Sequence, residues 1–265
     1  MRDEYLTKIP ILLQYQAEIQ AFCGKATRTM FDNPIDLLGP HSKNVIALVS
    51  GLEAELESLV QGMAELPGKD PTSPWNWLTC PDITRHYYLS AKLFLRTQHF
   101  FNSDSSNERR VAILQAYNSA ISLISSMITA DAGLGLFAHI PAYLFRMLFT
   151  AAGVVFKVLS SSYRQDVDLD LGKTTLNEAI TAMRKCSVEN NDVPGRHAEI
   201  IRQLWLCAET LTTIDTSQPP VLSHRSRFGA SLSYDCLFQW RETVGGQRST
   251  GLHSSTTSMY GLFPC

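Results

Sequence analysis

Residues 141–159, PAYLFRMLFTAAGVVFKVL, are apolar around nearly the whole circumference of a helix. Such a helix must be buried on most of its faces, so the rest of the chain has to supply elements that pack around it. The segment starts at Pro141 and carries Arg146 and Lys157, which a bilayer span would tolerate poorly. We therefore predict a central core helix within a bundle, and no association with a membrane.

The remaining apolar residues recur with the 3.6-residue period of a helix, and almost no stretch alternates as a strand would. The predicted fold is all-α, an irregular multi-helix bundle of about eight helices. One all-α domain is expected over residues 1–245, and the Gly/Ser/Thr-rich residues 246–265 are expected to form a disordered tail. Besides the core helix, the clearest helical patterns lie at residues 43–66, 83–102, 102–130, 169–187, 194–211 and 228–240.

Three stretches between these helices have distinctive composition. Residues 68–82 combine three prolines with Trp75 and Trp77, which predicts a loop anchored by its tryptophans. The glycine motif at 133–138 has the spacing of a dinucleotide fingerprint but follows a helical pattern, so we predict that it separates two helices. The alternating aspartates at 166–170 lack the glycine and glutamate of a calcium loop, and they indicate a helix N-terminus instead.

Charge and cysteine spacing exclude several classes of function. The chain has 23 Lys plus Arg against 25 Asp plus Glu, so it lacks the basic surplus that neutralises phosphates. We expect no direct contact with nucleic acid from this chain. No C-x-x-C pair is present, which argues against a zinc site and favours buried free thiols in a reducing compartment. The cysteines are Cys23, Cys80, Cys186, Cys207, Cys236 and Cys265.

Two segments carry a family resemblance: MRKCSVENNDVPGRHAEIIRQLW at 183–205 and RFGASLSYDCLFQWRETVGGQ at 227–247. They resemble the regulatory region of fungal zinc binuclear-cluster transcription factors. In that family an all-α domain, called the middle homology or fungal-specific transcription factor domain, follows an N-terminal DNA-binding cluster. The helix order over residues 1–245 is similar as well. The motif residues, whose role is expected to be structural, are Arg184, Cys186, Asp192, Pro194, Gly195, Arg196, Glu199, Trp205, Gly229, Tyr234 and Trp240.

The resemblance implies a regulatory domain that is not an enzyme, with no catalytic, cofactor-binding or metal-binding residue. Its expected location is the nucleus, with the cytoplasm as an alternative. The expected partners are the transcription machinery or co-regulators and a small-molecule effector, and a homodimer is expected for a full-length form. The family's six-cysteine zinc cluster, basic linker and coiled coil are absent from this chain, so zinc is expected only in a DNA-binding domain outside it.

The charges of the first segment also have a physical interpretation. The arginines at 184, 196 and 202 lie among the acidic residues at 189, 192 and 199, which predicts a turn between two helices held by capping and ion pairs, with Trp205 buried in the bundle.

Two alternatives remain open. Asn191, Asp192 and Glu199 match part of a magnesium motif of terpene synthases, although Gly195 replaces its serine, so one alternative is a magnesium-dependent all-α lyase. The simpler interpretation of Asp192 is an acidic helix cap. The second alternative is a stand-alone interaction module that controls related transcription factors.

Overall fold

The computed structural model describes residues 11–31, 45–64, 83–101, 106–210, 218–222 and 231–245. These residues form eight α-helices and no strand, which confirms the predicted all-α multi-helix bundle for this part of the chain. The predicted loop at 68–82 and the predicted tail at 246–265 lie outside the described residues, and so does Gly229.

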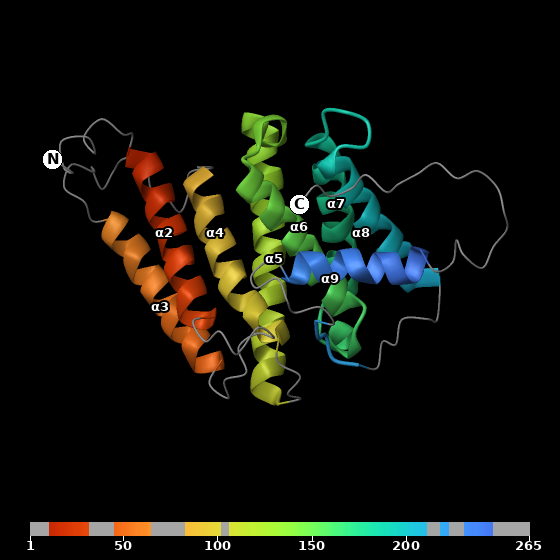
Figure 1. The fold of residues 1–265 in the computed structure, drawn as a ribbon, viewed down its shortest axis with the longest axis horizontal. Coiled ribbons are helices and arrows are strands. Elements are labelled where there is room, and N and C mark those ends of the chain that lie inside the picture. The colour runs from red at the N-terminus through yellow and green to blue at the C-terminus, as the bar shows by residue number, and fades with distance from the viewer. Residues whose placement is uncertain are drawn as a thin grey trace.

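Figure 1 shows α2 and α3 at one end of the molecule, then α4, α5 and α6, and α7 and α8 toward the other end, where α9 runs across the other helices. Helix α9 contacts α6 and α8. Short 3-10 turns at residues 97–101, 136–139 and 162–166 connect some of them, and a π-helical turn at 241–245 follows the last. The α-helices are α2 (Ile11–Phe31), α3 (Val45–Ala64), α4 (Ile83–Arg96), α5 (Asn107–Leu134), α6 (Ala142–Leu159), α7 (Leu169–Lys185), α8 (Val193–Thr210) and α9 (Ser231–Trp240).

Helix α6 is the core helix that the apolar segment predicts. All its residues from Met147 to Leu159 are buried, because α4, α5, α7, α8 and α9 each contact it. By length and composition alone, α5 and α6 are each apolar enough to cross a membrane, but 78% of the apolar window of α6 is buried inside the structure. Burial of this extent is the property of a core helix in a bundle.

The termini of two helices show why the sequence folds locally as it does. Gly135 adopts a left-handed conformation with φ of 61° and ends α5, so the glycine motif separates two helices. Asp168 caps α7, since its Oδ1 accepts hydrogen bonds from the backbone N–H groups of Asp170 and Leu171 at 3.0 Å. Both arrangements agree with the predictions for these stretches.

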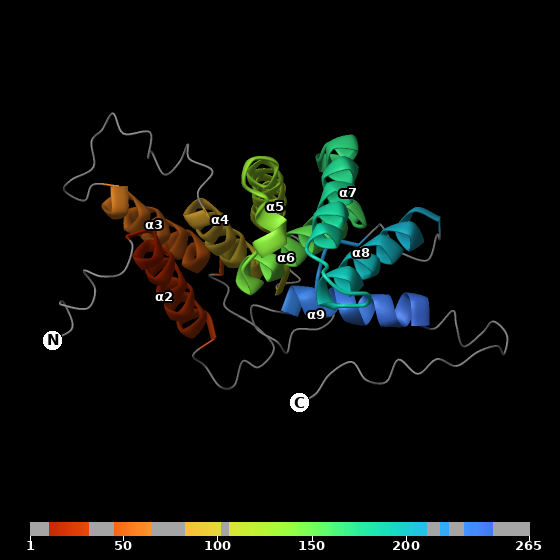
Figure 2. The same ribbon diagram turned by 90° about the horizontal axis from the view of Figure 1, so that it is seen from above.

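The apolar core is divided into two clusters that meet at α4. One cluster joins α2, α3 and one face of α4, and the other joins the opposite face of α4 to α5–α9. Ala91 and Leu95 belong to the first cluster, while Leu93 belongs to the second. Figure 2 shows α2 and α3 beside α4 at one end of the molecule, away from α7 and α8.

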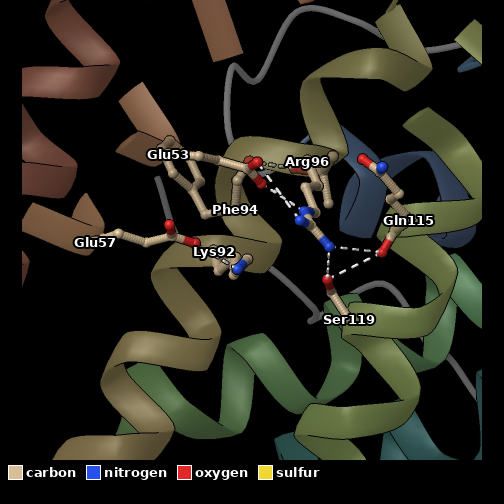
Figure 3. A network of polar contacts seen from close by, with 8 residues as sticks. Glu53, Glu57, Lys92, Phe94, Arg96, Gln115 and Ser119 are labelled. Carbon is tan, nitrogen blue, oxygen red and sulfur yellow. Dashed lines mark hydrogen bonds and ion pairs between the residues drawn. The ribbon is translucent and has the colours of Figure 1, made fainter. Parts of the chain in front are cut away.

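A polar network around Arg96 connects α3, α4 and α5 beside these clusters (Figure 3). Its Nε donates to Oε1 of Glu53 at 2.5 Å, and its Nη1 donates to the carbonyl of Gln115 at 3.1 Å and to Oγ of Ser119 at 2.7 Å. One guanidinium on α4 thus holds both neighbouring helices.

Candidate functional site

The residues singled out from the two family-like segments lie on three helices that contact one another. Arg184 lies in the last turn of α7 and Cys186 is its C-cap. Asp192 directly precedes α8, the motif residues from 194 to 205 lie within α8, and Tyr234 and Trp240 belong to α9. Helix α8 contacts both α7 and α9 (Figure 1). The structure therefore brings two segments that are distant in sequence into one region, except Gly229, which lies outside the described residues.

Asp192 organises the turn between α7 and α8. Its Oδ1 accepts hydrogen bonds from the backbone N–H of Gly195 at 2.9 Å and from Oγ of Ser187 at 2.8 Å. Its Oδ2 accepts from the backbone N–H groups of Val188 at 2.8 Å and Glu189 at 3.3 Å. Partial burial opposes ionisation, but these four bonds outweigh it and lower the pKa of Asp192 to about 2. The carboxylate therefore acts as an acidic cap that closes the turn.

The neighbours of Asp192 fit this closed turn. Asn191 has a left-handed backbone with φ of 65°, and its carbonyl accepts a hydrogen bond from Arg196 Nη1 at 2.8 Å. A Cβ atom at Gly195 would lie 3.2 Å from both Asp192 Oδ1 and Ser187 Oγ, so a side chain there would crowd the cap. Pro194 lies in the first turn of α8. Backbone N–H groups there have no acceptor within the helix, so a proline costs no helical hydrogen bond.

Glu199 connects α8 to its two neighbours. Arg202 binds its carboxylate through two hydrogen bonds of 2.8 and 2.5 Å, and Arg184 of α7 approaches within 3.9 Å. Gln203 Nε2 donates to the same carboxylate at 2.6 Å, while Gln203 Oε1 accepts from Trp240 Nε1 of α9 at 2.7 Å. The hydrogen bond from Arg202 is the main cause that lowers the pKa of Glu199.

These contacts refine the predicted ion pairs of the turn. Arg184 and Arg202 do face an acidic side chain, whereas the hydrogen bond of Arg196 goes to a backbone carbonyl. Trp205 is buried, as expected, and Lys173 of α7 lies over its ring at 6.0 Å from the centroid.

Helix α9 is seated on α6 through a notch at Gly153. A Cβ atom there would lie 2.8 Å from Leu232 Cδ2 and 3.1 Å from Cys236 Sγ, so the two helices touch where α6 has no side chain. Beside the notch, Thr150 and Ser233 hydroxyls lie 3.0 Å apart. This close approach fixes the position of α9 along α6.

A buried ion pair lies in the same interface. Lys157 of α6 pairs with Asp235 of α9, and their side chains are only 9% and 1% exposed. The sequence shows Lys157 within the core helix, but it does not identify Asp235 as its partner. A buried lysine is a signal in itself, since lysine is almost never fully buried unless it is paired.

The titratable side chains at the junction of α7, α8 and α9 are arranged for packing. Burial raises the pKa values of the Cys186 and Cys236 thiols to about 12, which keeps them protonated and unreactive. His197 stacks at a tilt on Phe149, with ring centroids 4.1 Å apart, and burial lowers its pKa to about 4. These groups stabilise the junction as neutral side chains.

The partial magnesium motif spans the turn between α7 and α8 and the start of α8. Its carboxylates at Asp192 and Glu199 already bind protein donors, as described above. Over the described ranges, no three His, Cys, Asp or Glu side chains gather as a set that would hold a metal ion.

Comparisons with known proteins add one similarity. No family model matches the chain, and no solved structure matches it. Regulatory protein LEU3 of Saccharomyces cerevisiae is 22% identical over 275 residues, which cover 89% of this chain and 30% of that protein. The chain thus spans about a third of the length of the curated relative it matches. The similarity is consistent with the fungal transcription-factor family and with a regulatory role.

Proposed function

We propose that this chain is the control domain of a fungal transcription factor. The observation that carries the proposal is the similarity to a regulatory protein over 89% of the chain. It is supported by the two family-like segments, which meet at the junction of α7, α8 and α9. In this proposal the protein acts in the nucleus.

The proposed control acts through the packing of the helices. A partner or a small effector changes activity only if it binds one packing of the bundle more tightly than another. Such a coupling is typically about 1–3 kcal/mol, or roughly a 5- to 150-fold change in affinity. The junction is suited to this role because a few polar contacts connect its three helices. Arg184 of α7 pairs with Glu199 of α8, and Gln203 of α8 accepts a hydrogen bond from Trp240 of α9.

Contact with DNA belongs to a different part of the regulator in this proposal. The net charge of −2 leaves no surplus of basic residues to neutralise phosphates. Zinc is assigned to that DNA-binding part, and the partners of this chain are co-regulators, the transcription machinery or an effector.

A fusion experiment tests the proposal. The chain is inserted between an unrelated DNA-binding domain and an unrelated activation segment, and transcription of a reporter gene is measured at equal protein levels. We expect output to change at least about fivefold relative to the fusion without the chain. A helical protein of the same size, inserted in its place, serves as the control. Equal output from both insertions would contradict the proposed function.

A further inference from the structure

The turn between α7 and α8 contains a second sequence pattern, which the regulatory role does not explain. Ser187 is preceded by Arg184 and Lys185 and followed by Val188, in the sequence RKCSV. Basic residues three and two positions before a serine, with an apolar residue after it, match the acidic and apolar subsites of basic-directed protein kinases. Arg184 is the only arginine of the whole sequence with a serine or threonine three residues after it.

The residues that such a kinase recognises are on the surface. The side chains of Arg184 and Lys185 are 54% and 58% exposed, and Val188 is 87% exposed. Helix α7 ends at Lys185, so the chain from Cys186 to Asp192 is already outside regular helix. The two basic side chains make only surface ion pairs, at 3.9 Å to Glu199 and 2.9 Å to Asp131, which contribute little to stability.

We propose that Ser187 is a phosphorylation site for a Ser/Thr protein kinase that selects basic residues, and that its phosphate opens the turn between α7 and α8. The kinase transfers the γ-phosphoryl group of ATP to Ser187 Oγ. The Oγ–P bond forms as the bond between the β- and γ-phosphates breaks, ADP leaves, and the hydroxyl proton passes to the kinase's base.

The geometry around Ser187 Oγ explains why phosphate opens the turn. The hydroxyl now donates a hydrogen bond to the Asp192 carboxylate at 2.8 Å, and a phosphorylated oxygen has no proton to donate. The modification also adds about −1.5 to −2 charge beside an ionised carboxylate, which repels it. Phosphate on Ser187 is therefore incompatible with the closed cap.

Phosphorylation of Ser187 and opening of the turn are thermodynamically linked. If phosphorylation favours the open turn, opening the turn must favour phosphorylation by the same factor at equilibrium. Asp192→Ala also removes the carboxylate that accepts the Ser187 hydrogen bond and populates the open turn, so a kinase should bind Ser187 more readily. The inference does not depend on the proposed function, because both effects are measured on the isolated chain.

The first measurement is phosphate incorporation into the purified chain. The chain is incubated with ATP and the catalytic subunit of cyclic-AMP-dependent protein kinase, and peptide mass spectrometry locates the phosphate. We expect labelling at Ser187, a loss of that label in Ser187→Ala, and an initial rate at least tenfold lower in the Arg184→Gln/Lys185→Gln variant. Lys173→Gln, which removes another partly exposed lysine of α7, is the matched control and should keep the native rate. Asp192→Ala should be labelled faster than the native chain.

The second measurement is hydrogen exchange in the phosphorylated chain. The amides of Gly195 and Arg196, which bond to the side chain and carbonyl of Asp192, should exchange at least tenfold faster after labelling, while those of α5 stay unchanged. An unlabelled Ser187 in the native chain, whether or not Asp192→Ala is labelled, would overturn the inference. Labelling that leaves the two amides unchanged would overturn it as well.

Discussion

Asp192 is the residue on which the α7–α8 turn depends most directly. Replacing it with alanine removes four hydrogen bonds and leaves the backbone N–H of Gly195, in the first turn of α8, without its acceptor. We expect Asp192→Ala to lower the free energy of unfolding by about 1 kcal/mol, the usual cost of losing an N-cap. Urea unfolding at pH 7 measures it. Glu178→Ala, an exposed change within α7, should stay within about 0.5 kcal/mol of the native chain, and an equally small effect of both would contradict the capping role.

His197 makes stability depend on pH. Its folded pKa of about 4, lowered mainly by burial, lies below the ordinary value of about 6.5 for an unfolded chain. The unfolded chain therefore binds the proton first, and stability falls as the pH drops from about 6.5 toward 4. Between pH 7 and 5 the native chain should lose about 1–2 kcal/mol more free energy of unfolding than His197→Gln does. His139→Gln, at an exposed histidine, is the control, and parallel pH curves for the native chain and His197→Gln would refute this role.

Helix α9 packs closely against α6 because Gly153 of α6 has no side chain. Gly153→Ala places a Cβ atom 2.8 Å from Leu232 Cδ2, so we expect it to destabilise the chain by about 1–3 kcal/mol and to speed amide exchange in α9. The matched control is Gly51→Ala in α3, where nothing lies within 4 Å of the added atom. That change should stabilise the chain by about 0.5–1 kcal/mol. Stabilisation by both alanines would show that the notch does not exist.

The Lys157–Asp235 pair should show strong coupling in a double-mutant cycle. Lys157→Met alone leaves the carboxylate of Asp235 buried without its cation, which costs about 3–5 kcal/mol. Replacing both residues by apolar ones, as in Lys157→Met/Asp235→Leu, should recover most of that loss. Additive effects of the two single changes on the free energy of unfolding would mean that the pair is not coupled.

Much of the helical architecture follows from the sequence, while the contacts between helices do not. The apolar circumference of residues 141–159 predicts the buried core helix, and the 3.6-residue pattern places α3 to α5 and α7 to α9 within a few residues of their bounds. Residues 11–31, which form α2, are not among the predicted helices. Helix α2 obeys the same spacing through Tyr15, Ile19, Phe22, Ala26 and Met30. In contrast, Gly153 in an apolar run looks like any small residue, because its role appears only when α9 lies against it. The turn at Asp192 was predictable because capping is local in sequence.

At the scale of the whole molecule, the two apolar clusters meet at α4, and Arg96 bridges the helices on either side (Figure 3). The family-like segments lie at the other end, around α7–α9. A change in the seating of α9 on α6 therefore passes directly into the larger cluster, since α6 lies at its centre. The proposed control of transcription should accordingly depend on an intact α6–α9 interface.

The most direct test of the central claim combines the reporter fusion with the two glycine variants. Output is measured for fusions that carry the native chain, Gly153→Ala or Gly51→Ala, at equal protein levels. The account predicts that Gly51→Ala keeps the native control of the reporter, whereas Gly153→Ala moves the output most of the way to that of the fusion without the chain. Native control by all three chains would contradict the claim that the packed junction of α6 and α9 carries the regulation.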